Sequence, residues 1–227
     1  MTINASEMEA KSRYRLFKPP LESWEKWVVD YLVSEIEAIK KTKQICSILL
    51  TGGRTAQSVY QEWSKTIVYL EDVNFFMGDD RLVPIDHTDS NSGMVKKTLF
   101  KNGISYKSNF YPLIYPLYKN ENFLIEYELK IQKPDIILLG VGDDGHIASI
   151  FPQNFKVEEV EFGYEIVESE NHMHKRVTIK QGNIINCSRV IALAKNKMNI
   201  YSLVNSENQT ISKNIPAWII RDKVWII

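Results

Sequence analysis

The sequence predicts an α/β fold with a mainly parallel β-sheet covered by helices on both faces. Three runs of strand length, at residues 45–50, 73–77 and 135–139, are rich in apolar side chains. Helix-length segments separate these runs, and a glycine closely follows each of them. Parallel strands need long crossover connections and are buried on both faces, which accounts for the spacing and for the apolar composition.

The spacing of apolar residues and the residues that flank them predict the helices and the remaining strands. Apolar side chains three and four residues apart indicate amphipathic helices, and a polar residue in front is expected to cap the first turn. Thr55, and either Asp89 or Ser90, stand at such positions. The predicted helices span residues 22–40, 55–63, 91–100, 121–132 and, with a proline in the first turn, 215–220. The predicted strands span residues 45–50, 73–77, 135–139, 163–168, 175–180, 190–194 and 223–227.

Length and charge narrow the class of protein. A chain of 227 residues without linkers or repeats predicts one domain over residues 1–227. The 28 basic and 28 acidic residues balance, which argues against a nucleic-acid partner or a polybasic membrane binder. No apolar run is long enough to span a bilayer, and residues 1–15 lack the apolar core of a secretory signal, so we expect a cytoplasmic protein.

Two features complete this general description. Cys46 and Cys187 each lie beside an apolar run, and two cysteines are too few for a disulfide framework. We therefore expect both to be buried free thiols with raised pKa values. Nothing in the sequence fixes the oligomeric state, so a monomer and a homodimer both remain open.

Ligands of open parallel sheets bind beyond the carboxyl ends of the strands, and three loops there carry reactive residues. The first is Thr51-Gly52-Gly53-Arg54-Thr55. Its glycines let a ligand approach the backbone, and its N–H groups, hydroxyls and guanidinium suit an anion such as phosphate. A tight turn that needs glycine only for its geometry explains the segment equally well. It matches neither a P-loop nor a dinucleotide fingerprint.

The second loop is Gly78-Asp79-Asp80-Arg81, directly after a strand. Asp79 and Arg81 place charged groups where a substrate would lie, although most charge runs of this kind are solvated surface loops.

Two histidine-containing stretches could imitate metal sites. They are Asp86, His87 and Asp89 after the second loop, and the pair His172 and His174. The first stretch has no second ligand cluster at a recognisable spacing, and the pair offers only two ligands with no carboxylate partner identified. We therefore expect no metal at either, and we interpret His172 and His174 as surface residues.

The third loop, residues 140–149, carries His146 after a glycine-rich turn, with Asp144 two residues before it. A histidine at the expected active edge, with a carboxylate close by, is suited to general acid/base catalysis. A lone histidine is more often structural, and its position at the strand end is what favours the catalytic interpretation.

These loops together resemble the 6-phosphogluconolactonase family, which is related to the glucosamine-6-phosphate deaminases. The matching segments are residues 49–60, 75–100, 135–152 and 175–179, with the C-terminal IPAWII and Trp225 also in agreement. The resemblance implies a Rossmann-like sheet of the NagB/RpiA type. It further implies hydrolysis of 6-phospho-D-glucono-1,5-lactone, a step of the oxidative pentose phosphate pathway, with no cofactor and no metal.

The resemblance also implies roles for individual residues. His146 would be the base that activates water, assisted by Asp144. Arg81 and Arg176 would bind the phosphate or lactone oxygens, and the loop of Gly52, Gly53, Arg54 and Thr55 would add backbone donors.

The chain departs from the family pattern at three places. Asp80 replaces a glutamate, Ala56 replaces a common proline, and Lys195-Asn196-Lys197 stands where the family usually has Gly-x-x-Lys. Two alternatives therefore remain open. One is a glucosamine-6-phosphate deaminase or isomerase, although the Asn-Glu-Pro typical of those enzymes is absent after the Gly-His pair. The other is a non-catalytic sugar-phosphate-binding protein of the same fold.

Overall fold

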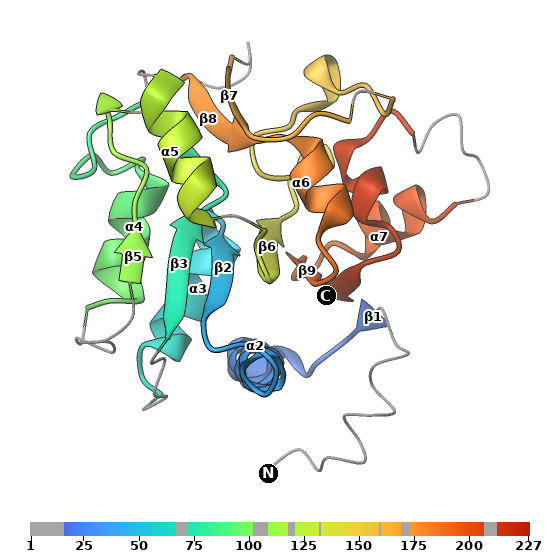
Figure 1. Cartoon of the computed structure of the whole chain (residues 1–227). Coiled ribbons are helices and arrows are strands. Elements are labelled where there is room, and N and C mark those ends of the chain that lie inside the picture. The colour runs from blue at the N-terminus through green and yellow to red at the C-terminus, as the bar shows by residue number, and fades with distance from the viewer. Residues whose placement is uncertain are drawn as a thin grey trace.

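A seven-stranded sheet, parallel at every strand pair, forms the centre of the computed structural model (Figure 1). The structure describes residues 16–66, 72–101, 109–117, 121–131, 133–158, 160–168, 173–206 and 213–227. In spatial order the strands are β1 (Leu16–Phe17), β10 (Val224–Ile226), β9 (Val190–Leu193), β6 (Ile136–Gly140), β2 (Cys46–Leu50), β3 (Val73–Met77) and β5 (Asn109–Tyr111). The predicted α/β fold class is therefore confirmed.

The central strands form where the sequence has its most apolar runs. Every residue of β2 and of β9 is buried, as expected for strands covered on both faces. Strands β1 and β5 were not predicted, because they contain only two and three residues and show no alternation. Their neighbours in the sheet, rather than local sequence, determine that they are strands.

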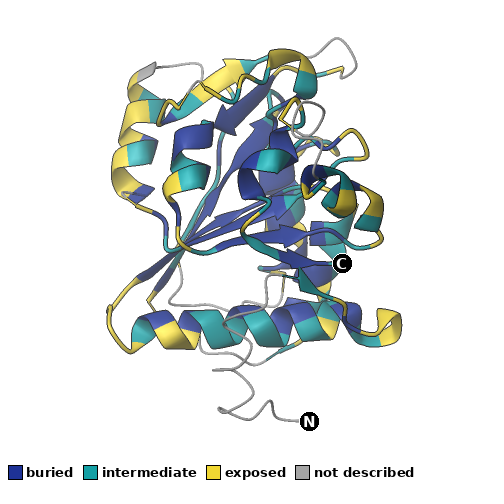
Figure 2. Ribbon diagram, turned by 90° about the vertical axis from the view of Figure 1, so that its right-hand side faces the viewer, coloured by how far each residue is buried: buried dark blue, intermediate teal, exposed yellow. Residues whose placement is uncertain are grey.

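Helices cover the sheet. They are α2 (Trp24–Lys40), α3 (Arg54–Trp63), α4 (Asn91–Thr98), α5 (Glu121–Ile131), α6 (Gln181–Asn186) and α7 (Met198–Val204), with 3₁₀ turns η1 (Leu21–Ser23), η3 (Pro152–Asn154) and η4 (Pro216–Ile220). Helix α2 is seen end-on at the bottom of Figure 1 and lengthwise at the bottom of Figure 2. Figure 2 also shows the strands buried and the exposed residues gathered on the outer sides of the helices. The short helices α6 and α7 were not predicted.

The two capping predictions have different outcomes. Ser90 caps α4, because its hydroxyl accepts a hydrogen bond from the backbone N–H of Gly93 at 2.9 Å. Thr55 does not cap α3, since that helix already begins at Arg54 and its N-cap is Gly53. Gly53 has a φ of +93°, a backbone conformation that glycine adopts easily. Thr55 lies within the first turn of the helix and so cannot be its N-cap.

A second, antiparallel sheet begins just after the carboxyl end of β3. It contains β4 (Asp79–Arg81), β8 (Arg176–Ile179) and β7 (Tyr164–Val167). The predicted strands near 163–168 and 175–180 are confirmed, but they belong to this small sheet. The segment Asp79–Arg81 was predicted to be a loop and is a strand, because β8 supplies the hydrogen-bonding partners that its charged sequence does not reveal. In this register Arg81 lies opposite Arg176.

The interior agrees with the expectations from composition. Both cysteines are buried and free, and burial raises the pKa of Cys187 and raises that of Cys46 to about 12. Trp24 and Trp63 are fully buried in the core, whereas Trp27 is partly buried against it. No helix within the described ranges combines the length and the apolar character that crossing a membrane requires.

A buried hydroxyl fixes the end of β2. Tyr60, fully buried on α3, accepts a hydrogen bond from the backbone N–H of Thr51 at 3.1 Å and donates one to the Thr51 carbonyl at 3.0 Å. Thr51 begins the first candidate loop, so this pair of hydrogen bonds sets where that loop starts.

Replacing this hydroxyl is expected to destabilise the fold. Tyr60→Phe leaves the N–H and the C=O of Thr51 without their partner, so the free energy of unfolding, measured by urea denaturation, should fall by about 1–3 kcal/mol. Tyr201→Phe is the control, because the Tyr201 hydroxyl forms no hydrogen bond with any described residue. Equal effects of the two substitutions would contradict this account.

Candidate active site

The candidate site lies where the order of strands reverses. From β2 the chain continues to β3 on one side, and it later returns to place β6 on the other side of β2. Loops after two such strands leave in opposite directions and open a crevice between them. A cavity of about 170 Å³ lies there. It is lined by Thr51, Gly52, Gly53, Asp79, Arg81, Asn91, His146, Ala148, Ser149, Phe151 and Arg176.

The first loop contributes backbone to this cavity. Gly52 lies so close to Asn91 that an added Cβ would stand 2.0 Å from the Asn91 Oδ1 atom. Thr51 joins the first loop to the third, because its Oγ1 accepts the backbone N–H of Gly140 at 3.2 Å. Arg54 and Thr55 begin α3 and, unlike the two glycines, do not line the cavity. Of the predicted anion loop, the structure therefore brings Thr51, Gly52 and Gly53 to the cavity and leaves Arg54 and Thr55 outside its lining.

The third loop contributes a hydrogen-bonded His–Asp pair. The Nδ1 atom of His146 lies 2.6 Å from Oδ1 of Asp144, and the backbone N–H of His146 donates to the same oxygen at 3.1 Å. Partial burial raises the pKa of Asp144, but the hydrogen bonds from His146 outweigh it and hold that pKa below its ordinary value. An ionised carboxylate can only accept, so Nδ1 of His146 carries the proton of this hydrogen bond.

A glycine makes room for this pair. A Cβ at Gly142 would stand 2.1 Å from Nδ1 of His146 and 2.7 Å from Oδ1 of Asp144. Both distances are well inside van der Waals contact, so a larger residue at this position requires the His146 and Asp144 side chains to move. Further along the loop, Ala148 lines the cavity with a φ of +48°, an unusual conformation for a residue with a side chain.

Two guanidinium groups meet in the cavity from the small sheet. Arg176 at the start of β8 is only 8% exposed, and its buried Nε–H has no hydrogen-bond partner among the described residues. Burial and the nearby positive charge of Arg81 both lower the pKa of Arg176. An arginine keeps its charge under these conditions, so the cavity contains a buried cation beside a second one. Such an arrangement favours an anionic ligand.

The buried carboxylate of Asp80 positions the segment around Arg81. Its Oδ1 accepts the backbone N–H of Asn91 at 2.6 Å and that of Arg81 at 2.7 Å, and its Oδ2 accepts that of Ser92 at 2.8 Å. Burial raises the pKa of Asp80 although these hydrogen bonds oppose the shift. Asp80 thus anchors the N-terminus of α4 to β4, and this is the position at which the chain departs from the glutamate of the resembled family.

Asp79 connects the small sheet with the third loop. It is buried, and its Oδ2 accepts a hydrogen bond from the Ser149 hydroxyl at 2.8 Å. The Asn91 side chain donates to the Asp79 carbonyl at 3.1 Å. Asn91, Ser149 and Phe151 line the cavity but were not predicted as site residues. Their position in the matched segments was the available signal, since local residue chemistry does not distinguish them.

The lysines that replace the family's Gly-x-x-Lys lie outside the lining of the cavity. Lys195 forms an ion pair with Glu25 at 2.7 Å and lies over the Trp24 ring. Lys197 forms an ion pair with Asp143 in the third loop. The two ammonium groups therefore have carboxylate partners on the protein.

Fold and site together define an α/β protein with a cavity at the switch point of its sheet that is lined by two arginines, a histidine and a glycine turn. The family model "Glucosamine-6-phosphate isomerases/6-phosphogluconolactonase" matches residues 21–226. The chain therefore belongs to the glucosamine-6-phosphate isomerase/6-phosphogluconolactonase family, as the resemblance indicated.

Curated relatives carry the name 6-phosphogluconolactonase. That of Neisseria meningitidis serogroup A is 31% identical over 132 residues, which is 56% of this chain and 56% of that protein. That of Helicobacter pylori strain J99 is 26% identical over 182 residues, 78% of this chain and 79% of that protein. Against the Neisseria and Thermotoga maritima proteins the match spans little more than half of their length, 56% and 58%.

Solved structures match over nearly the whole chain. The 6-phosphogluconolactonase from Trypanosoma cruzi has a TM-score of 0.77 and 25% identity, and the match covers 94% of each chain. The one from Shewanella baltica has a TM-score of 0.75 and 19% identity over 93% of this chain and 94% of that chain. These structures share the Rossmann-like, NagB/RpiA-like fold that the sequence predicted.

The position of Gly142 gives a direct test of the His–Asp pair. Gly142→Ala should push the imidazole of His146 away from Asp144 by at least about 1 Å, because non-bonded heavy atoms pack no closer than about 3.5 Å. The hydrogen-bonded Nδ1–H resonance of His146 in the nitrogen-15 spectrum of the wild-type protein should then be lost. Gly140→Ala is the matched control, since its added Cβ would find its nearest atoms at 3.6 and 3.7 Å. Retention of the resonance in Gly142→Ala would refute the geometry.

Proposed function

We propose that this protein hydrolyses 6-phospho-D-glucono-1,5-lactone to 6-phospho-D-gluconate, a step of the oxidative pentose phosphate pathway. The observation that carries the proposal is the convergence of His146, Arg81 and Arg176 on one cavity at the carboxyl edge of the sheet. A lactone is an activated ester, so its hydrolysis requires a positioned base, stabilisation of an oxyanion and a means of holding the substrate. The family and the names of the relatives agree with this chemistry.

His146 serves as the base in this proposal. Its Nδ1–H donates to Asp144, and this hydrogen bond orients the ring and stabilises the imidazolium that forms. Nε2 removes a proton from water while the water oxygen bonds to the lactone carbonyl carbon. The bond from that carbon to the ring oxygen then breaks. The ring oxygen takes the proton from the imidazolium and leaves as the sugar hydroxyl. The new carboxylic acid then loses its proton to solvent to give 6-phospho-D-gluconate, so protons and charge balance.

The cations and the glycine loop bind the anionic parts. The substrate carries a phosphate at one end and develops a negative oxygen at the carbonyl during attack. Arg81 and Arg176 bind the phosphate or the lactone oxygens, and the backbone at Gly52 and Gly53 offers N–H donors. Repulsion between the two guanidinium groups is relieved when an anion lies between them, so binding energy far from the reacting carbon aligns the substrate.

Ser149 and the cysteines have no part as nucleophiles in this mechanism. The Ser149 hydroxyl is buried and donates to Asp79, and burial raises the pKa of both thiols. Hydrolysis therefore proceeds by direct attack of water, without a covalent intermediate.

The test is a direct assay. The lactone is generated enzymatically, and acid release is followed with and without the protein, with the spontaneous rate subtracted. His146→Ala should lower kcat by about 10²–10⁴-fold, because it removes general base catalysis. Arg176→Gln should mainly raise KM, because it removes one of the two cations that hold the anion.

Arg189→Gln is the matched control for the arginine. Arg189 forms a partly exposed ion pair with Glu35 at 2.9 Å and does not line the cavity. It should leave kcat and KM unchanged. A wild-type protein that never exceeds the spontaneous rate would reject the lactonase proposal in favour of a sugar-phosphate-binding protein. Sustained ammonia release from glucosamine-6-phosphate would instead favour the deaminase.

A further inference from the structure

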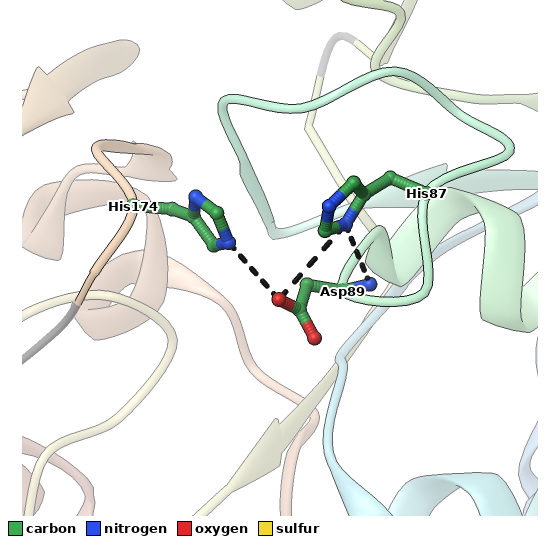
Figure 3. Close-up of side chains that lie close together, drawn as sticks. All are labelled: His87, Asp89 and His174. Carbon is green, nitrogen blue, oxygen red and sulfur yellow. Dashed lines mark hydrogen bonds and ion pairs between the residues drawn. The ribbon is translucent and has the colours of Figure 1, made fainter.

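A second group of reactive side chains lies beside the candidate site. His87 and Asp89 follow β4, and His174 precedes β8, yet the three side chains converge (Figure 3). Nε2 of His174 lies 2.9 Å from Oδ2 of Asp89, and Nδ1 of His87 lies 3.9 Å from the same oxygen. The two imidazole rings meet edge to face with their centroids 5.4 Å apart.

The sequence separates these residues into two stretches, with His87 and Asp89 in one and His174 in the other. Pairing of β4 with β8 brings the stretches together, because Arg81 at the end of β4 lies opposite Arg176 at the start of β8. Over the described ranges, His87, Asp89 and His174 are the one group of three or more His, Cys, Asp or Glu residues whose ligand atoms all lie within 4.8 Å of one another.

The donor set has a defined chemical preference. Two imidazole nitrogens and one carboxylate oxygen suit zinc and other divalent first-row transition metals better than calcium or magnesium, which prefer oxygen ligands. With bonds of about 2.0–2.1 Å to a tetrahedral ion, ligand atoms stand about 3.3 Å apart. The distances of 2.9 and 3.9 Å to Asp89 bracket this value. All three ligand atoms lie within 4.8 Å of one another, so side-chain rotations that bring them closer together would complete the site.

The local hydrogen bonds can be replaced by bonds to a metal ion. Nδ1 of His87 accepts the backbone N–H of Asp89 at 3.1 Å, so this nitrogen carries a lone pair, which a metal ion would take over from that N–H. His87 and Asp89 have side chains 41% and 42% exposed, so water and ions reach the cluster. When Nδ1 of His87 binds a metal ion, the exposed backbone N–H of Asp89 loses this acceptor and can form a hydrogen bond with water instead.

We propose that His87, Asp89 and His174 bind a divalent transition-metal ion of the zinc type at the rim of the cavity. Three protein ligands leave a fourth position for water. The ion would join two segments that each carry a cavity arginine. The Asp89 carbonyl accepts a hydrogen bond from Nη1 of Arg81 at 2.7 Å, and His174 lies two residues before Arg176. Metal binding thereby stabilises this corner of the small sheet, whether or not the lactonase proposal holds.

The test measures zinc binding to the whole chain after treatment with a chelator. Titration of Zn²⁺ in competition with a chromogenic chelator should give one ion per chain, and Co²⁺ should produce visible absorption bands of a low-symmetry site. Zinc at about 100 times its Kd should raise the midpoint of thermal unfolding by about 5 °C or more. His174→Ala, His87→Ala and Asp89→Asn should each weaken zinc binding by at least about tenfold.

Control variants remove the other histidines. His172→Ala, at a position outside the described residues, and His146→Ala, which breaks the separate His–Asp pair, should both keep the full affinity for zinc. Thermal unfolding without metal verifies that every variant is folded, and His174→Gln replaces His174→Ala if the latter is not. Zinc affinity that is unchanged in all three cluster variants, or that is lost in His146→Ala or His172→Ala instead, would overturn the proposal.

Discussion

The arrangement of the cavity depends on one unfavourable contact, the burial of Arg176 beside Arg81. A buried guanidinium needs partners, and the described part of the chain provides no hydrogen bond for its Nε–H. Asp79, Asp80 and Asp89 attract Arg176 only through longer-range electrostatics. We therefore propose that the partner of this cation is an anion from solution. This single constraint supports the proposal that the protein acts on a phosphorylated substrate.

The two sheets contribute different residues to the cavity. The parallel sheet supplies the loops after β2 and β6, which bring the glycine turn and the His146–Asp144 pair to its carboxyl edge. The small antiparallel sheet supplies the cations, because its register places Arg81 opposite Arg176. Asp80 and Asp79 join the two parts through buried hydrogen bonds to α4 and to the third loop. Displacing either sheet would separate the base from the anion site.

Much of this organisation could be predicted from sequence, and the exceptions share a cause. Strands β2, β3 and β6 are apolar runs with a glycine behind them, so burial and turn geometry are both visible in the residues. Segment Asp79–Arg81 is charged and becomes a strand only because β8 pairs with it, which local propensity does not show. For the same reason, His87 and His174 looked unrelated. Arg54 and Thr55 have suitable chemistry, but they belong to the first turn of α3 and are not among the residues that line the cavity.

The free energy of unfolding of Arg176→Met, measured with and without 6-phosphogluconate, tests the central claim most directly. If Arg176 is a cation held for an anionic ligand, the variant without ligand should be as stable as the wild type, or more stable by about 1–4 kcal/mol. Added 6-phosphogluconate should stabilise the wild type and should have much less effect on the variant. A variant that is several kcal/mol less stable, and that gains as much from the ligand as the wild type does, would contradict the account.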